Sequence, residues 1–168
     1  MKQQKEPLDF PRQLIKGRIA EVVFEQMFRE AGDFAILRFG YEYTLPELAQ
    51  YQKSYRDNAK ADKVMETVRH APDFVLASKE KGIVFLVEVK YRSEVRAVEM
   101  LKLAKSAVNR WDPSWIFVAS PETFYLSSCH EIINASGVIK ELSVGWVAED
   151  IQKRYLGLLH EFERCAKR

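Results

Sequence analysis

The stretch from Ile83 to Tyr91 constrains the fold more than any other part of the sequence. Residues 83 to 87 are apolar at consecutive positions, so a strand here must be covered on both faces and lie inside a sheet. A second apolar run, from Asp73 to Ala77, precedes it across the polar connection from Ser78 to Gly82. Five polar residues that end in glycine favour an antiparallel hairpin.

Helices are predicted on both sides of this hairpin. Apolar residues at three- and four-residue spacing indicate helices over residues 11–31, 94–110 and 147–166. Gly32 follows the first of them, at the position of a C-terminal cap. In the second helix, the residues predicted to face inward are Val98, Leu101, Ala104 and Val108.

Further strands complete a layered fold. Aromatic and β-branched residues predict strands over residues 34–43 and 115–119, while residues 124–133 fit either a strand or a short helix. We therefore expect an α/β fold, with a central mixed sheet of four or five strands flanked by helices.

One domain is predicted for the whole chain, residues 1–168, because a core of this size can stabilise a single fold. A partly helical excursion is expected at about residues 44–70, where Thr44 and Glu47 form a helix-start signature. Tyr51 and Tyr55 on its face either pack against the core or stack on nucleic-acid bases.

Composition excludes some classes of protein. The net charge of +2 lacks the strong basic excess of many nucleic-acid-binding proteins, so any such function must rest on local features. The longest apolar run is far shorter than the roughly 20 residues that span a bilayer, and the polar start has no signal-peptide core. We expect a cytoplasmic protein without membrane contact, with Cys129 and Cys165 reduced.

Charged residues interrupt the buried strand at its end. Glu88 and Lys90 are two residues apart, so their side chains leave the same face, while Val87 and Val89 point the other way. Ionised groups at such a position are costly unless they are paired, solvated in a cleft or bound to a metal.

The hairpin brings Asp73 close to this pair in two alternative registers. If Ala77 pairs with Ile83, Asp73 lies opposite Val87; a connection one residue shorter places it opposite Glu88. Two carboxylates so close favour a cation between them, and oxygen ligands without histidine or thiolate suit Mg²⁺ or Mn²⁺. With Lys90 beside an activated water, these groups suffice for phosphodiester hydrolysis.

These residues resemble a known signature. Pro72-Asp73, fourteen residues and then Glu88-Val89-Lys90 are similar to the PD-(D/E)xK motif of the restriction-endonuclease-like nuclease superfamily. The resemblance spans about residues 12–119 and implies a core of helix, three strands, helix and strand. It also implies that Asp73, Glu88 and the main-chain carbonyl of Val89 bind the metal, and that Lys90 is the catalytic lysine.

The first predicted helix adds to the resemblance. Gly17 and Glu21 are similar to the Gly-x-x-x-Glu pattern of Holliday junction resolvases, which implies that Glu21 completes the catalytic metal site. Without a side chain at Gly17, this helix could approach the sheet edge closely. Glu25 is the competing position, interpreted as a solvated face residue. The excursion and the region after residue 119 depart from the family's minimal core, so the substrate cannot be carried over.

Residues near the motif are candidates for substrate binding. Tyr91 and Arg92 follow the motif lysine directly and are predicted phosphate contacts. His70 is a candidate base or phosphate contact, with an ordinary exposed or hydrogen-bonded histidine as the alternative. Basic residues of the next helix either extend this surface or form a wet helix face; they are Arg96, Lys102, Lys105 and Arg110.

Three functions remain open from the sequence. The first is a Mg²⁺-dependent nuclease that acts on DNA, with RNA left open as the substrate; the second is a catalytically silent protein of this fold that binds nucleic acid or a protein partner. The third is an enzyme that acts on another phosphorylated molecule. The apolar stripe of the last helix is either core or a homodimer interface; it consists of Ile151, Tyr155, Leu158, Leu159 and Phe162.

Overall fold

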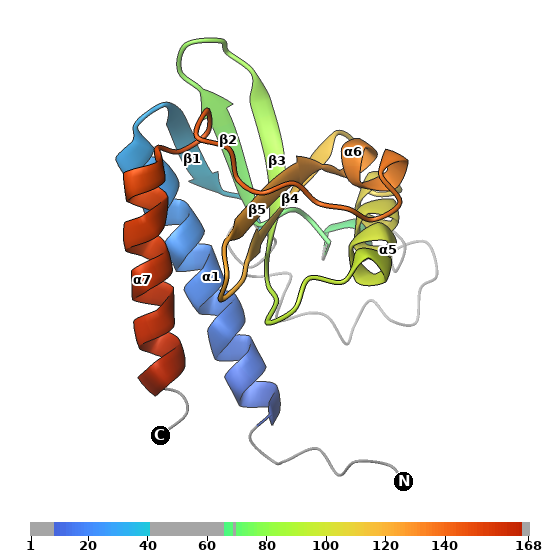
Figure 1. The fold of residues 1–168 in the computed structure, drawn as a ribbon. Helices are drawn as coiled ribbons and strands as arrows, with labels where there is room; N and C mark the ends of the chain where they lie inside the picture. Colours follow the sequence, from blue (N-terminus) through green and yellow to red (C-terminus); the bar gives the residue numbers. More distant parts are fainter. Residues whose placement is uncertain (1–8, 41–65, 69, 166–168) are drawn as a thin grey trace, which may run out of the picture.

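The computed structural model describes residues 9–40, 66–68 and 70–165 (Figure 1). Most of the predicted excursion, including Tyr51 and Tyr55, lies outside these residues. The elements in chain order are α1 (Asp9–Ala31), β1 (Phe34–Arg38), β2 (Phe74–Ser78), β3 (Val84–Tyr91), α5 (Ala97–Val108), β4 (Ser114–Ala119), β5 (Phe124–Ser128), α6 (Cys129–Asn134) and α7 (Glu149–Cys165).

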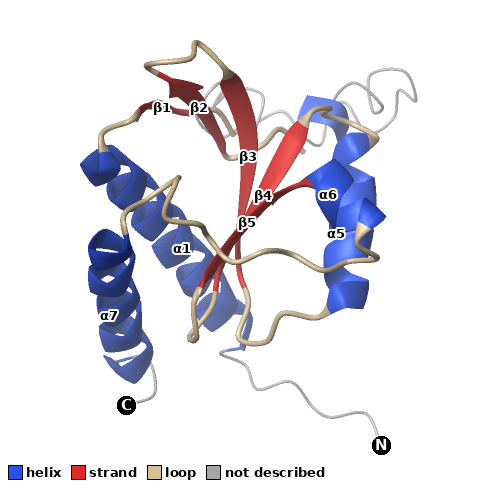
Figure 2. Ribbon diagram, turned by 45° about the horizontal axis from the view of Figure 1, so that its top comes forward, coloured by secondary structure: helices blue, strands red, loops and turns tan. Residues whose placement is uncertain are grey.

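The strands form one mixed sheet in the order β1-β2-β3-β4-β5. Among the described strands, β3 and β4 pair in parallel, and the chain crosses between them through α5; the other neighbours are antiparallel. Figure 2 shows α1 and α7 on one side of the sheet and α5 and α6 on the other. The predicted α/β fold with flanking helices is confirmed, and the sheet has five strands.

Two apolar layers hold the helices on the sheet. On the α1 side, the ring of Phe24 lies 4.9 Å from that of Phe117 and 5.0 Å from that of Phe74. On the α5 side, Ile116 and Val118 are fully buried with Met100. Neighbouring residues of β4 thus serve opposite layers, as expected for a strand covered on both faces.

The inward face of α5 agrees with the prediction in part. Ala104 is fully buried and Val108 packs against the same layer, as predicted, whereas Val98 is 81% exposed and Met100, which was not predicted to face inward, is fully buried. Leu103 and Ala107 pack against the same layer. Both stripes have helical spacing and share Ala104 and Val108, so α5 is rotated from the prediction toward the side of Met100.

Boundaries account for the remaining differences. β1 ends at Arg38 rather than at residue 43. Just after it, the N–H groups of Phe39 and Gly40 both donate hydrogen bonds to the carbonyl of Asp73. The segment predicted as either a strand or a short helix, residues 124–133, contains both: the strand β5 is followed directly by the helix α6. Gly32 has a φ of +84° and caps α1, as predicted.

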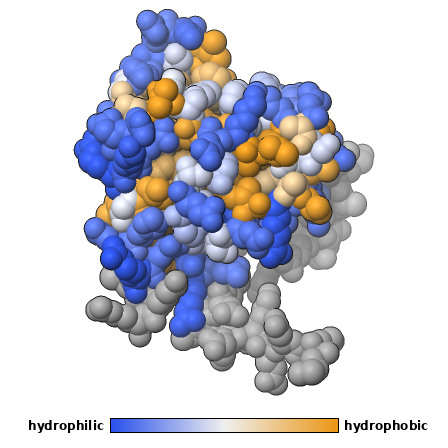
Figure 3. Space-filling model, in the orientation of Figure 1, coloured by the Kyte–Doolittle hydropathy of each residue, from blue (hydrophilic) through white to orange (hydrophobic). Residues whose placement is uncertain are grey.

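The surface of the described residues is mixed. Hydrophobic groups lie among hydrophilic ones on the face in Figure 3. In α7, Leu159 is buried, which fits the core alternative for its stripe, whereas Leu158 and Phe162 are 38% and 46% exposed. Scattered exposed apolar side chains are ordinary for a globular protein. None of the described helices has the length and apolar character needed to span a membrane.

The rotation of α5 makes a direct prediction. Met100→Ala removes a fully buried side chain and should lower the free energy of unfolding by about 2–5 kcal/mol, because a cavity remains. Val98→Ala on the same helix should change it by less than about 0.5 kcal/mol. Urea denaturation of both variants measures these values, and equal effects would contradict this orientation of α5.

Candidate active site

The β2–β3 hairpin adopts the shorter of the two predicted connections. The register pairs Phe74 with Val87 and Ala77 with Val84, and the N–H of Ser78 donates to the carbonyl of Ile83 at 2.8 Å. Continued by one residue, this register places Asp73 opposite Glu88. The alternative register, with Ala77 opposite Ile83, is wrong because the turn closes one residue earlier.

Gly82 allows this tight connection. Its φ of +64° is unfavourable for other residues, and its N–H donates to the carbonyl of Ser78 at 3.0 Å. The turn therefore sets which side chains of β2 and β3 face each other at the far end of the hairpin.

The alternation of β3 is as predicted. Val87 and Val89 are buried in the α1 layer, whereas Glu88 and Lys90 leave the opposite face and form an ion pair. Both charged side chains keep partial contact with solvent, with 22% of Glu88 and 29% of Lys90 exposed. The charges on this buried strand are thus both paired and solvated in a cleft.

Asp73 is fixed by the main chain of the neighbouring strand. Its Oδ2 accepts a hydrogen bond from the N–H of Val89 at 2.7 Å. Because β2 begins only at Phe74, the Asp73 side chain provides the acceptor beyond the end of the ladder. A carboxylate held in this way keeps a constant position beside Glu88.

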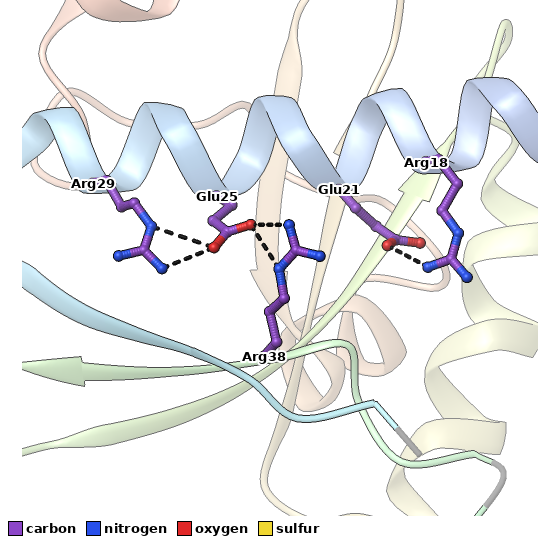
Figure 4. Close-up of polar contacts among 5 residues, drawn as sticks. All are labelled: Arg18, Glu21, Glu25, Arg29 and Arg38. Carbon is purple, nitrogen blue, oxygen red and sulfur yellow. Dashed lines mark hydrogen bonds and ion pairs between the residues drawn. The ribbon is translucent and has the colours of Figure 1, made fainter. Parts of the chain in front are cut away.

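Glu21 reaches the same region from α1. Arg18 donates to its carboxylate at 2.9 Å, one helical turn away, as Figure 4 shows. Burial raises the pKa of Glu21, and the nearby charge of Asp73 adds to this rise, although Arg18 and Lys90 oppose it. The pKa of Glu21, the predicted third carboxylate of the site, therefore depends on the charge of Asp73.

One cleft of about 390 Å³ contains all four predicted catalytic residues. Glu21 comes from α1, Asp73 from the residue before β2, and Glu88 and Lys90 from β3. The other lining residues are Gln13, Leu14, Gly17, Arg18, Gly40, His70, Ala71, Leu103, Ser106, Ala107 and Arg110. Segments far apart in the sequence thus meet around one concave site of ligand-binding size.

The charges of the cleft influence one another. Burial raises the pKa of Glu88, and the charge of Asp73 adds to the rise while Lys90 opposes it. Burial alone would lower the pKa of Lys90, but Glu88 and Asp73 outweigh it and raise this pKa, so the ammonium stays charged at neutral pH. Crowded carboxylates beside a fixed cation are typical of sites that bind metal and phosphate.

Of the residues predicted to contact the substrate, His70 lines the cleft and Tyr91 does not. His70 lines the cleft, and its Nδ1 lies 2.7 Å from the carbonyl of Glu66. Tyr91 instead contacts Glu163 of α7 and Lys16 of α1, and burial together with Glu163 raises its pKa. Because successive residues of β3 alternate, Tyr91 lies on the face opposite Lys90, outside the cleft lining.

Among the other basic residues, Arg110 and Arg18 line the cleft and Arg92 does not. Arg92 bonds to the Tyr91 carbonyl and lies 3.6 Å from Glu99, away from the cleft lining. Arg110 does line the cleft and pairs with Glu66 at 2.8 Å. Arg18 was missed by the sequence analysis, although an arginine three residues before a glutamate on a helix is a recognisable pairing signal.

Glu25 is buried, which corrects its interpretation as a solvated residue. Only 5% of it is exposed, and its carboxylate accepts hydrogen bonds from Arg38 at 2.9 Å and from Arg29 at 2.8 Å (Figure 4). Burial alone would raise the pKa of Glu25, but the two arginines outweigh it and lower this pKa. Arg38 of β1 lies on the α1 side of the sheet, so Glu25 joins α1 to β1 instead of entering the cleft.

The residues of the cleft suit a hard divalent cation in their chemistry. Asp73, Glu88 and Glu21 offer carboxylate oxygens, which Mg²⁺ and Mn²⁺ prefer, and their mutual repulsion would fall if a cation lay between them. Among residues 9–40, 66–68 and 70–165, however, the side-chain positions form no metal-ligating group of three or more acidic, histidine or cysteine residues. The metal remains a prediction.

Comparison with known proteins gives no family for this chain: no protein-family model matches it, and no curated protein is similar to it.

The Glu25 cluster predicts a pH-dependent contribution to stability. Because its folded pKa lies below the ordinary value, the charged carboxylate stabilises the fold above about pH 4.3, and this stabilisation is lost as the pH falls through the folded pKa. Glu25→Gln should therefore lower the free energy of unfolding by about 1–3 kcal/mol at pH 7.

The difference from wild type should shrink on acidification below about pH 4. Chemical denaturation between pH 3 and pH 7 measures it, with Glu149→Gln as control, since Glu149 forms an exposed ion pair with Lys153. A difference for Glu25→Gln that does not change with pH would contradict the assigned role.

Proposed function

We propose that this protein is a metal-dependent nuclease of the PD-(D/E)xK kind, which hydrolyses phosphodiester bonds of DNA with Mg²⁺ or Mn²⁺. The observation that carries the proposal is the meeting of Glu21, Asp73, Glu88 and Lys90, from three separate segments, in one cleft. An ion pair that only stabilised a strand would need neither Asp73 across the hairpin nor Glu21 from α1.

The order of elements supports the same proposal. The resemblance implies a helix, three strands, a helix and a strand, and the chain has α1, β1, β2, β3, α5 and β4 in this order. The motif residues lie where β2 begins and where β3 approaches its end. Fold alone does not establish an activity, so the proposal depends on the cleft.

Each residue of the cleft has a role in this proposal. Asp73, Glu88 and Glu21 would hold the metal, with the main-chain carbonyl of Val89 as a further ligand. The metal, when bound, would polarise the scissile phosphate and lower the pKa of a water molecule. Lys90 keeps its charge at neutral pH and would orient the attacking water and offset negative charge that develops on the phosphate.

Basic groups at the cleft would position the nucleic acid. Arg18 and Arg110 line it on α1 and just after α5, and His70 adds a polar group. Besides Lys90, these three residues are the basic side chains of the described cleft lining, and the net charge of the chain is only +2. We infer a restricted substrate, because few phosphate contacts give weak non-specific binding.

Cleavage assays test the proposal. Wild type should cut linear, single-stranded or branched DNA with Mg²⁺ and lose this activity with EDTA. Asp73→Ala and Lys90→Ala should each reduce the rate by about 10²–10³-fold or more while the fold is retained. Glu94→Gln is the matched control, because Glu94 follows the motif closely but is exposed and paired with Arg96. Undiminished cutting by either cleft variant would refute the assignment.

A second function is favoured by a specific observation: the carboxylates of the cleft already have partners within the protein. Glu88 pairs with Lys90, Glu21 with Arg18, and Asp73 accepts from Val89. Such a self-neutralised cleft would suit a catalytically silent protein that binds nucleic acid. Nucleic-acid binding that is unchanged by Mn²⁺ or EDTA, without cleavage of any substrate, would favour this alternative.

A further inference from the structure

Gly17 is an unusual residue within the wall of the cleft. It lies well inside α1, where glycine weakens a helix relative to alanine because it adds backbone freedom and no packing. The sequence analysis explained Gly17 by a close approach of the helix to the sheet. The structure contradicts this explanation: apart from its chain neighbours and the backbone of its own helix, a Cβ atom built on Gly17 would meet no atom of the described residues within 4 Å.

The space beside Gly17 therefore belongs to the cleft. Gly17 lines it together with Glu21, one helical turn further along the same face. Within the described part of the chain, a glycine that the packing does not require, next to a proposed catalytic carboxylate, leaves room for part of a substrate.

The surroundings of Gly17 indicate which part of a substrate would occupy this space. Leu14 lines the cleft on the preceding turn of α1 and is 56% exposed, and α5 adds Leu103 and Ala107. The lining thus includes the carboxylates of Glu21, Asp73 and Glu88 and also apolar side chains, of which Leu14 is about two turns of α1 from Glu21. With Lys90 and the proposed metal ion, the scissile phosphate would lie at the carboxylates, while the face of a base would lie against the apolar side chains.

We propose that Gly17 is a specificity-determining residue, whose bare backbone accommodates the nucleoside next to the scissile phosphate. This inference rests on the proposed nuclease function and deepens it. Gly17 touches no reacting atom in this arrangement, so a side chain at this position obstructs binding of the substrate rather than the chemical step.

The chain offers a matched control for Gly17. Gly157 also lies inside a long helix, α7, and its Cβ would likewise meet no described atom within 4 Å, but Gly157 is not among the residues that line the cleft. Substituting either glycine should have the same effect on the helix, and only Gly17 should affect the substrate.

Two measurements on four variants test the inference. Gly17→Ala and Gly157→Ala should each raise the midpoint of thermal unfolding by about 2–4 °C, since alanine favours the helix. In steady-state cleavage of a fluorescent single-stranded oligodeoxynucleotide with Mg²⁺, Gly17→Leu should raise KM about tenfold or more and change kcat little. Gly157→Leu should leave both constants at their wild-type values.

The outcomes separate this inference from the proposed function. Wild-type KM and kcat in Gly17→Leu would overturn the role of Gly17 and leave the nuclease activity intact. Equal losses in Gly17→Leu and Gly157→Leu would also overturn it, because the effect would then come from the helices. Absence of DNA cleavage by wild type would overturn both the nuclease and the inference that rests on it.

Discussion

The burial of several carboxylates in one place is the constraint on which the cleft depends. Burial and the charge of Asp73 together raise the pKa values of Glu21 and Glu88, so these groups are less readily ionised than exposed glutamates. A fold selected for stability alone would not gather acidic groups in this way, and such local conflicts are concentrated at functional sites. Pairing with Arg18 and Lys90 offsets part of the repulsion.

The rest of the fold holds these groups in place. The β2–β3 turn sets Asp73 opposite Glu88, and the Val89 N–H fixes the Asp73 carboxylate. The buried phenylalanine rings of the α1 layer pack this helix against the sheet. The Glu25–Arg38 hydrogen bond joins the same helix to β1, only one turn from Glu21. The position of Glu21 over the cleft thus follows from packing on one side and from a buried ion pair on the other.

Much of this arrangement could be predicted from the sequence, and the failures have physical causes. The alternation that separates Glu88 from Val89 is a local property of a strand, so it was predictable. The rotation of α5 was not, because Val98 and Met100 both fit a helical stripe and only the partner surface chooses between them. Glu25 was misplaced because its neutralising arginine, Arg38, lies on another element. Tyr91 and Arg92 follow the motif directly in sequence, yet the side chain of Tyr91 points to the opposite face.

The most direct test of the central claim is the crystal structure of the protein soaked with Mn²⁺, with the anomalous signal of manganese used to locate the ion. The account predicts an anomalous peak in the cleft with Asp73 and Glu88 as ligands, and loss of this peak in Asp73→Ala crystals grown and soaked in the same way. A cleft without a peak at saturating Mn²⁺, with Glu88 still paired to Lys90, would contradict it.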